Sequence, residues 1–488
     1  MKRIITFLVG LLVAGVAWAQ QTQQAESFTL EQCIQFALEN SIAAKNAEID
    51  KQIARAKVNE TIGIGLPQIS GSGSLVHNKT LPRFFGIYSD DPNGFSFFPP
   101  GIQNAKNGDV LAAKSPFQLP SSGNASLTVN QIIFNGSYIV GLQASSTYKE
   151  LSIKSKEQTE QTIIQQVTKA YYSVLINNER ADLFDNNIAR VDSLLRSTTA
   201  LNQNGFAESI DVDRVRVTFN NLKAERDKFL NLNELGLQLL KFQMNYPLDK
   251  PIEIAGSIQD VEVNADPKGY NEGWDYHNRP EYKVLEVNRK LQELNIKNQH
   301  AGSIPTLSAF GTLGYSTQSS NVSGLFKTNS SVKDEGGLGP DKWYQFSQFG
   351  LSLNVPVFSG LQRHYRVQQE KLKLNQIDNN FVNLKNSIDL EIKQTAINFD
   401  NALKTLVSQK DNQVLAGNIA RVTKIKYEQG VGSSLEVTDA ENSLRTAQLN
   451  YYSALFDAMV AKVDLDKAYG KLLPSNYKTN TIVNPANK

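Results

Sequence analysis

Few side chains in this 488-residue sequence have the types and spacing that catalysis or metal binding requires. Gly71–Ser72–Gly73 is not followed by the rest of a phosphate-binding loop, so no nucleotide site is predicted. The four histidines are scattered, and none belongs to a metal-ligand or nucleophile motif: His77, His277, His300 and His364. We therefore expect no catalytic residue, no metal and no cofactor, and any transport must take its energy from another protein.

The N-terminus has the three parts of an export signal. The basic pair Lys2–Arg3 precedes an apolar stretch, Ile4–Val16, and an A-x-A cleavage site, Ala17–Trp18–Ala19. Residues 1–19 are therefore predicted to be a signal peptide. Cys33 is the only cysteine and lacks the context of a lipid-attachment site, so we expect neither a lipid anchor nor a disulfide within one chain. No later segment is long and apolar enough to predict a membrane-spanning helix.

The charges of the chain nearly cancel, with 50 basic and 48 acidic residues and no long block of one sign. A nucleic-acid partner normally needs a basic face, so none is expected. The charged residues lie along the helical stretches, as on solvated helix faces.

Two long stretches, Ser121–Tyr246 and Val357–Leu473, contain none of the chain's 16 prolines. Proline disrupts helix interiors, so these stretches favour long helices. Each contains one glycine punctuation, at Gly205 and at Gly430–Val431–Gly432, where the chain is predicted to reverse. From Gly136 to the first reversal, a helix with a rise of ~1.5 Å per residue would be about 100 Å long. Ser433 with Glu436, and less strongly Ser209 with Asp211, are the predicted caps of the returning helices.

These helices have coiled-coil seams rich in alanine. Apolar residues recur at steps of three and four, and we interpret them as packing positions without individual function. The seams consist of Ile164, Val167, Tyr171, Val174, Asn178 and Ala181 in the first stretch, and of Val437, Ala440, Leu444, Ala447, Tyr451, Ala454, Ala458, Ala461, Leu465 and Ala468 in the second.

The sequence is duplicated. Three pairs of short segments match in the same order, which indicates that each half repeats a helix, two strands and a helical hairpin. The opening helices are predicted at Leu30–Gly63 and Pro280–Gly302. The pairs are Leu66–Ser70 with Ile304–Ser308, Asn130–Gly136 with Asn354–Gly360 (an offset of 224), and Gly205–Val212 with Gly430–Val437 (an offset of 225).

Four segments alternate between apolar and small or polar residues, as β-strands do: Pro67–Val76, Ala125–Asn130, Thr306–Tyr315 and Phe349–Val357. Phe310 breaks the pattern on the polar face. The pattern fits a half-buried sheet of a soluble protein or the wall of a membrane barrel, apolar toward lipid. Four strands cannot close a barrel, so the membrane interpretation requires several chains to contribute strands together.

In these features the chain resembles the TolC-type outer-membrane efflux family over nearly its whole predicted mature length. The motifs are Phe28–Thr29–Leu30–Glu31–Gln32 with Ala37–Leu38–Glu39–Asn40, Leu66–Pro67, Asn278–Arg279–Pro280–Glu281, and Lys426–Tyr427–Glu428–Gln429–Gly430–Val431 followed by Leu435–Ala440. The resemblance implies a mostly α-helical chain with a β-barrel portion. It further implies a homotrimer, in which a 12-stranded barrel in outer-membrane lipid continues as an α-helical barrel in the periplasm.

The resemblance also divides the chain. It implies a first repeat and a second repeat separated by an equatorial linker, with extracellular loops between the strands of each repeat. The aromatic, proline-rich first loop fits a lid or partner surface, or simply a locally packed loop. The segments are 1–19 (signal peptide), 20–246 (first repeat, loop 77–123, turn near 205), 247–273 (linker), 274–471 (second repeat, loop 316–347, turn near 430) and 472–488 (C-terminal equatorial tail).

In this family the hairpin turns form the periplasmic tip, where a periplasmic adaptor links the channel to an inner-membrane pump. The resemblance therefore implies an adaptor-contact tip at Gly205, Phe206, Ala207, Gly430, Val431 and Gly432. Some members narrow the tip with acidic residues six and nine positions before the turn glycine. The residues at these positions here are Lys424 and Arg421 in the second repeat and Thr199 and Arg196 in the first. Facing a lumen they would favour anions, whereas facing neighbouring helices or water they would not.

Two other functions remain alternatives. An enzyme is disfavoured because no catalytic motif is present. A periplasmic coiled-coil adaptor or scaffold would share the export signal, but an adaptor usually has one hairpin per chain, whereas this sequence predicts two. Drugs, metal ions, siderophores and secreted polypeptides all suit a passive duct of this kind, and the sequence favours none of them.

Overall fold

The structure, a computed structural model, describes residues 26–91, 98–114, 118–258, 270, 273–327 and 342–472. The predicted signal peptide and the C-terminal tail beyond Leu472 lie outside these residues, as do 259–269 and 271–272 of the predicted linker. Contacts divide the chain into two compact units. The sheet unit comprises Ala56–Ser146 and Glu293–Lys371, and the helical unit comprises Met1–Arg55, Thr147–Gln292 and Leu372–Lys488. Each unit draws on both sequence repeats, so the division of the chain at 247–273 stays a prediction.

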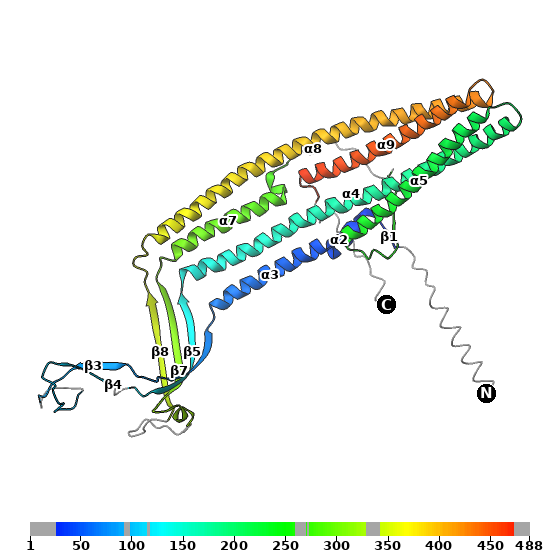
Figure 1. The fold of residues 1–488 in the computed structure, drawn as a ribbon. Coiled ribbons are helices and arrows are strands. Elements are labelled where there is room, and N and C mark those ends of the chain that lie inside the picture. The colour runs from blue at the N-terminus through cyan, green and yellow to red at the C-terminus, as the bar shows by residue number, and fades with distance from the viewer. Residues whose placement is uncertain are drawn as a thin grey trace, which may run out of the picture. The chain divides into compact units, whose positions relative to one another are not determined.

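The centre of the sheet unit is a four-stranded antiparallel sheet (Figure 1). Its strands follow the order β2 (Gln68–His77), β5 (Ser121–Phe134), β7 (Thr306–Ser319) and β8 (Tyr344–Asn354). All four predicted strands are therefore present. The fourth was predicted to run to Val357 but ends at Asn354, because Pro356 has no N–H to contribute to a ladder.

The two faces of this sheet differ in chemistry. Residues directly opposite one another share a face, and one such row joins Ile69, Val129, Gly311 and Phe349. The large apolar side chains of this face are exposed in the single chain: Phe349 at 89%, Leu351 at 69% and Leu313 at 60%. On the other face, hydroxyl pairs join neighbouring strands, such as Ser72 with Ser126 at 3.0 Å and Thr128 with Thr312 at 3.2 Å. Phe310 lies on this polar face, as its position in the sequence indicated.

A second, smaller ribbon lies in the loop between β2 and β5. Strands β3 (Arg83–Ile87) and β4 (Val110–Lys114) pair antiparallel, which the sequence analysis did not predict. Tyr88 and Phe98 are buried in this loop, with exposures of 1% and 6%, so its described residues pack locally. Phe95 and Phe97 of the same loop lie outside the described residues.

Two helices open the first repeat where one was predicted. Helix α2 (Leu30–Asn40) ends at Ser41, whose ψ of 146° is extended, and α3 (Ile42–Ile64) follows at once. Helix α2 begins with a reciprocal capping box between Thr29 and Gln32. The matching helix of the second repeat, α7 (Pro280–Ala301), is continuous and follows the predicted bounds to within one residue.

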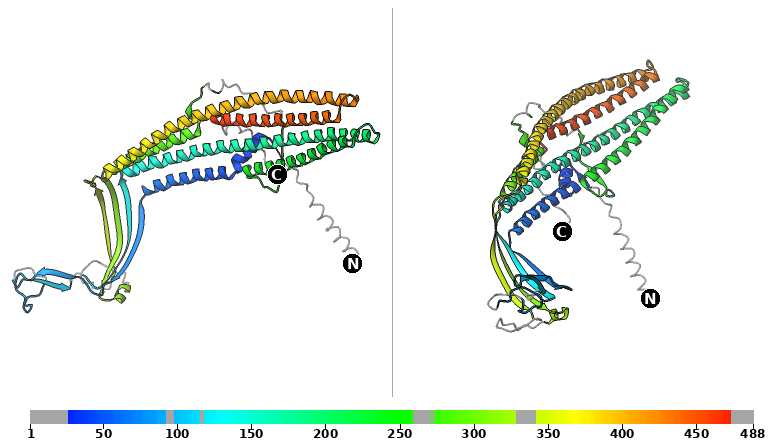
Figure 2. Two further views of the ribbon diagram at one scale, coloured as in Figure 1. Left: turned by 45° about the horizontal axis from the view of Figure 1, so that its top comes forward. Right: turned by 60° about the vertical axis from the view of Figure 1, so that its left-hand side comes forward.

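The two helical hairpins are confirmed and nearly equal. Helices α4 (Gly136–Gln203) and α5 (Ser209–Met244) have 68 and 36 residues, and α8 (Gln362–Glu428) and α9 (Ser434–Ala468) have 67 and 35. The paired helices lie side by side in each hairpin in all views (Figures 1 and 2). None of the helices among the described residues combines the length and apolar character needed to cross a membrane.

The predicted alanine seam of α9 packs against α8. Ala440, Leu444 and Ala447 form a buried cluster with Ala416 and Ala420 of α8. Small side chains let the two backbones approach closely along this seam. In α4 the predicted seam is buried from Ile164 to Val174 and at Ala181. Asn178 is exposed, but its side-chain oxygen accepts a hydrogen bond from the Asn233 amide of α5 at 2.7 Å, so it still contacts the partner helix.

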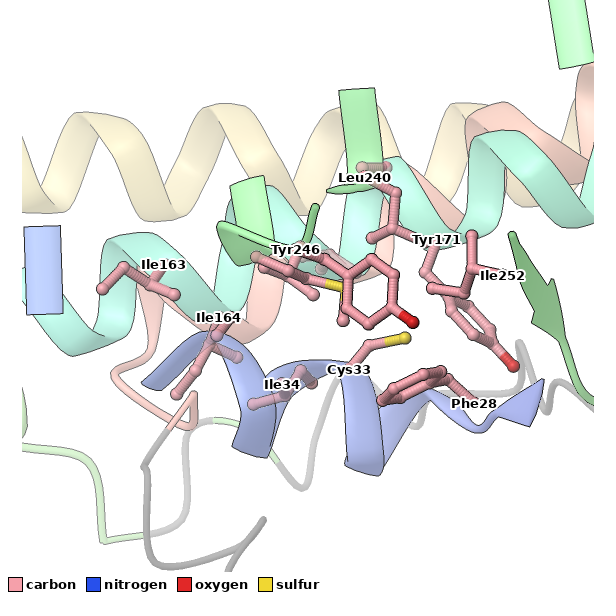
Figure 3. Close-up of a cluster of buried hydrophobic side chains, with 14 of the residues drawn as sticks. Phe28, Cys33, Ile34, Ile163, Ile164, Tyr171, Leu240, Tyr246 and Ile252 are labelled. Carbon is pink, nitrogen blue, oxygen red and sulfur yellow. The ribbon is translucent and has the colours of Figure 1, made fainter. Parts of the chain in front are cut away.

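The largest core of the helical unit joins the N-terminal segment to the first hairpin (Figure 3). Cys33 and Ile34 of α2 contact Tyr171 of α4 and Leu240 of α5 in one buried cluster. Strand β1 (Glu26–Phe28) pairs in parallel with β6 (Ile252–Ile254) beside it. Burial raises the pKa of the Cys33 thiol to about 12, so this cysteine is a packing residue rather than a nucleophile.

Candidate functional site: the tip of the two helical hairpins

Both hairpins reverse through the same turn geometry. Gly205 and Gly430 have φ angles of 77° and 73°, the left-handed conformation that glycine adopts without strain. In the first turn, the amide of Phe206 donates to the Leu201 carbonyl at 2.8 Å, and the amide of Gly205 donates to the Asn202 carbonyl at 3.0 Å. This pair of bonds is a Schellman motif.

The second turn repeats that motif. The amide of Val431 donates to the Lys426 carbonyl, and the amide of Gly430 donates to the Tyr427 carbonyl, both at 3.0 Å. The amide of Gly432 also donates to the Lys426 carbonyl at 3.1 Å. The left-handed glycines predicted from the sequence are therefore confirmed in both turns.

The caps of the returning helices agree with the sequence analysis in one repeat only. Ser433 is the N-cap of α9, and its hydroxyl accepts the Glu436 amide at 3.2 Å. In the first repeat the predicted cap, Ser209, is wrong. Glu208 occupies the N-cap position without a side-chain hydrogen bond, and Ser209 is already helical. The likeness of the two turns therefore comes from their backbones rather than from shared capping side chains.

The residues that follow the two glycines present apolar side chains to solvent. Phe206 is 81% exposed and Val431 is 77% exposed in the single chain. A side-chain hydrogen bond also stabilises the first turn, because the Asn202 side-chain amide donates to the Ala207 carbonyl at 2.8 Å. A fixed backbone with exposed apolar side chains is a suitable surface for a protein partner.

Between the two turns lies a groove of about 950 Å³. Four of the six predicted tip residues line the groove: Phe206, Ala207, Gly430 and Gly432. Gly205 and Val431 are not among the lining residues. The groove combines apolar side chains with charges of both signs, and its lining includes Leu194, Leu201, Leu435, Asp211, Arg214, Lys424 and Glu428.

The groove owes its shape to contacts between the hairpins that the sequence analysis missed. Thr198 of α4 is fully buried and lies within hydrogen-bond distance of the Tyr427 hydroxyl of α8, at 3.1 Å. Farther from the turn, Arg190 of α4 pairs with Glu441 of α9 at 3.2 Å. Tyr427 was part of a motif quoted from the sequence, which was the only available signal for this contact.

The four basic or polar residues that were candidates for a constriction occupy different settings. Arg196 is exposed and pairs with Asp192, one turn earlier in α4. The Thr199 hydroxyl donates to the Leu195 carbonyl at 2.7 Å. Arg421 is exposed, and Lys424 lines the groove, 3.9 Å from Glu428. The structure brings Lys424 alone of these four into the groove, and a lumenal role for any of the four stays a prediction.

One further polar cluster lies in the helical unit at the start of α7. The Arg279 side chain is only 4% exposed, and it donates to the Ala468 carbonyl and to Glu391, each at 2.8 Å. It also pairs with Glu281 at 3.1 Å. Arg279 thus ties α7 to α8 and α9, which gives the Asn278–Arg279–Pro280–Glu281 motif a structural role.

The described residues contain no group of three or more histidine, cysteine, aspartate or glutamate side chains that could hold a metal ion. His77 pairs with Ser121 at the end of the sheet, and His277 lies between Asp275 and Glu286. Ser121 is fully buried beside His77, and both side chains beside His277 are carboxylates. The groove at the hairpin tip presents apolar and charged side chains that suit a binding surface.

An exposed apolar sheet face and two nearly equal helical hairpins are the architecture of an outer membrane efflux protein. The profile of the family described as "outer membrane efflux protein" matches residues 33–233 and 276–471. Since these ranges cover most of the sequence, the chain belongs to the outer membrane efflux protein family. Membership of this family places the protein in the outer membrane.

Characterised relatives are distant. The chain is 23% identical over 338 residues to the probable efflux pump outer membrane protein TtgC of Pseudomonas putida, a match that covers 67% of this chain and 64% of TtgC. The antibiotic efflux pump outer membrane protein ArpC of the same species matches to the same extent. The match thus spans less than two thirds of the length of these relatives.

Solved structures show the same fold over nearly the whole chain. The outer membrane protein VceC of Vibrio cholerae has a TM-score of 0.65 at 13% identity, with 90% of this chain and 96% of VceC covered. The open state of the MtrE outer membrane channel of Neisseria gonorrhoeae has a TM-score of 0.66 at 17% identity, with 91% and 89% covered. The predicted fold class, an α-helical barrel with a β portion, is therefore confirmed.

Proposed function

We propose that this chain is the outer-membrane channel of a tripartite efflux or type I secretion system. In this role it is a passive duct, with no catalytic activity and no cofactor of its own. Substrates pass from a periplasmic adaptor and an inner-membrane pump to the exterior. The observation that carries the proposal is the sheet with an exposed apolar face and open edges on both sides.

An open sheet edge is incompatible with lipid. Among the described strands, β2 pairs only with β5 and β8 pairs only with β7, so each has one side without a partner. Backbone groups without partners cost several kcal/mol each in hydrocarbon, and the smallest single-chain barrels have about eight strands. Three chains with four strands each would close a twelve-stranded barrel and leave no edge. A homotrimer in outer-membrane lipid is therefore part of the proposal.

The hairpin turns are the proposed contact with the adaptor. Phe206 and Val431 expose apolar side chains on hydrogen-bonded turns, and the groove between the turns has a volume of about 950 Å³ and the mixed apolar and charged lining that suits a partner helix. The residues proposed to touch the adaptor are Gly205, Phe206, Ala207, Gly430, Val431 and Gly432. The inner-membrane pump would be reached through this adaptor.

The alternative of a periplasmic scaffold is less well supported. A soluble scaffold would have to bury the apolar face of the sheet, whereas Phe349 and Leu351 are largely exposed and no described element of the sheet unit covers them. The two hairpins would suit either function. The sheet therefore favours the channel.

The native mass of the protein, extracted in detergent from the outer-membrane fraction, tests the proposal first. We expect a particle of three chains that resists dissociation in mild detergent. A monomer, or recovery in the soluble periplasmic fraction, would overturn the channel and favour the scaffold.

The adaptor contact is tested separately. The double variant Phe206→Ala with Val431→Ala should weaken co-purification of the adaptor and reduce export, while the trimer stays intact. Phe242→Ala is the matched control, because Phe242 is also highly exposed (71%) but lies at the opposite end of α5. Equal effects of the two changes would remove the turns from the adaptor contact.

A further inference from the structure

The two open edges of the sheet carry enough information to determine how they meet. We propose that β8 of one protomer pairs antiparallel with β2 of the next in a single register. In this register Asn354 lies opposite Gln68, Phe349 opposite Gly73, and Gln345 opposite His77. The inference rests on the proposed trimeric channel and goes beyond it, because it names the contacts that close the barrel.

The direction and the parity of this pairing follow from the faces of the sheet. Strands β2 and β8 run in opposite directions in one chain, since three antiparallel steps separate them, so β8 meets the next β2 antiparallel. The apolar face carries the odd-numbered residues of both strands, such as Ile69 and Phe349. A slip by one residue would place the apolar face of β8 beside the polar face of β2. The register must therefore join odd-numbered residues to odd-numbered residues.

Complete pairing selects one register among those that remain. The proposed register pairs all ten residues of β2, Gln68–His77, with Gln345–Asn354. A shift by two residues in one direction leaves nine pairs, and a shift by two in the other leaves eight. Because unpaired backbone groups in hydrocarbon are costly, full pairing is favoured.

The geometry of a closed barrel gives independent support. Within one chain, the registers place Gly73 level with Ala125, Tyr315 and Gln345. The proposed contact places the next protomer's Gly73 opposite Phe349, four residues farther along β8. Four residues at ~3.3 Å, over four strand spacings of ~4.8 Å, correspond to a strand tilt of about 35°. Barrels require a tilt of about 35–45°, so the tilt excludes the shift with a two-residue offset, which would give only about 19°. The opposite shift has a six-residue offset and a tilt of about 46°, and the loss of two residue pairs disfavours it.

Side-chain sizes fit the same register on the apolar face. Phe349 and Leu351, both highly exposed in the single chain, come to lie opposite Gly73 and Gly71. The protein already uses this arrangement inside one chain. The ring of Phe310 lies 2.9 Å from the position that a Cβ would occupy on Gly350, and Phe346 lies 2.8 Å from the same position on Gly314. Aromatic side chains over strand glycines protect the backbone and help to fix register.

The polar face gives a second match. Val76 and Phe346 are the apolar residues that interrupt the polar face of β2 and β8, and the proposed register places them directly opposite each other. Neighbouring pairs on this face are polar on both sides, such as Ser70 with Ser352. Either two-residue shift would place Phe346 opposite Ser74 or Asn78 instead. Thus both faces are complementary in the proposed register.

Cysteine cross-linking between protomers measures the register. In the full chain, Ser70→Cys is combined with Ser352→Cys, with Gly350→Cys or with Asn354→Cys, and outer-membrane fractions are oxidised or treated with a short dithiol cross-linker. Opposed residues have Cβ atoms about 4.5–5.5 Å apart, within reach of a disulfide or a short linker. The native Cys33 is fully buried in the helical unit, so the chain without added cysteines serves as the control for background cross-linking. Ile69→Cys with Leu353→Cys repeats the test on the apolar face.

We expect covalent dimers and trimers from Ser70→Cys with Ser352→Cys and from the apolar-face pair, at least tenfold more than from either shifted pair. Preferential cross-linking of Ser70→Cys with Gly350→Cys or Asn354→Cys would overturn the register and leave the trimeric channel standing. Absence of every cross-link together with a trimeric native mass would overturn the β8–β2 contact itself. A monomeric native mass would overturn the proposed function, so the two failures are distinguishable.

Discussion

Replacing Gly430 by valine tests whether the hairpin turn depends on its left-handed backbone. Gly430 has a φ of 73°, and a Cβ added there would meet no heavy atom within 4 Å. The Cβ of the new side chain therefore meets no neighbouring residue, so the expected cost within the turn is backbone strain. A left-handed conformation costs an L-residue about 1–2 kcal/mol, with β-branched residues at the upper end. Such a change raises the population of the opened turn by a factor of about 5–30.

Hydrogen exchange of the turn amides measures this opening. The amides of Val431 and Gly432 both donate to the Lys426 carbonyl, at 3.0 and 3.1 Å, and both bonds require the left-handed residue between helix and turn. We expect Gly430→Val to accelerate exchange at these amides about tenfold. The native mass should stay that of the trimer, while adaptor capture and export decrease because the docking surface is no longer fixed.

Two matched variants make the result interpretable. Gly430→Asn should behave almost as the wild type, because asparagine tolerates the left-handed conformation. Gly417→Val places the same side chain in the interior of α8, where the nearest atom would be Leu444 Cδ1 at 3.9 Å, and it should not affect the turn. Equal exchange rates in Gly430→Val and Gly430→Asn would refute the argument that the φ angle is what the turn requires.

Three further predictions concern other polar sites of the helical unit. Hydrogen bonding to Asp275 at 2.8 Å raises the pKa of His277 above its usual 6.5. The protonated His277 therefore stabilises the folded protein at lower pH, and this stabilisation is lost as the pH rises through the raised pKa. Asp275→Asn should lower the His277 pKa in an NMR titration. Arg279→Met should destabilise the protein by about 2–3 kcal/mol. This loss lies below the range for fully buried ion pairs, because Glu281 and Glu391, the partners of Arg279, are partly exposed. Thermal unfolding of the extracted trimer measures the change. Reversal of Arg421 and Lys424 to glutamate should shift ion selectivity in planar bilayers toward cations if both side chains line the lumen.

Each of these has an outcome that contradicts it. An unchanged His277 titration in Asp275→Asn would show that the hydrogen bond does not hold the proton. Arg289→Met is the control for Arg279, because Arg289 pairs with Asp378 in an exposed setting, and equal losses in the two variants would refute a special role of burial. Unchanged selectivity would place Arg421 and Lys424 outside the lumen.

The repeating plan of the chain could be predicted from local signals in the sequence. Proline-free stretches, the residues after each helix and the alternation of apolar side chains are local signals, and they predicted both hairpins, the left-handed Gly205 and Gly430, and all four long strands. Where local signals were weak, the prediction was less accurate. Ser41 interrupts the first helix, and strands β3 and β4 pair in a loop where no alternation was recognised.

The groove at the hairpin tip and the contacts beside it could not be predicted in this way, because they join segments that are distant in the sequence. Thr198 and Tyr427 are 229 residues apart in the sequence, and the parallel pairing of β1 with β6 joins Phe28 to Ile254. Such contacts depend on how two long helices or distant strands are placed against each other, and no local propensity encodes that placement. The registers of the sheet belong to the same class, because the position of Gly73 relative to Gln345 emerges only after three successive strand pairings have been made.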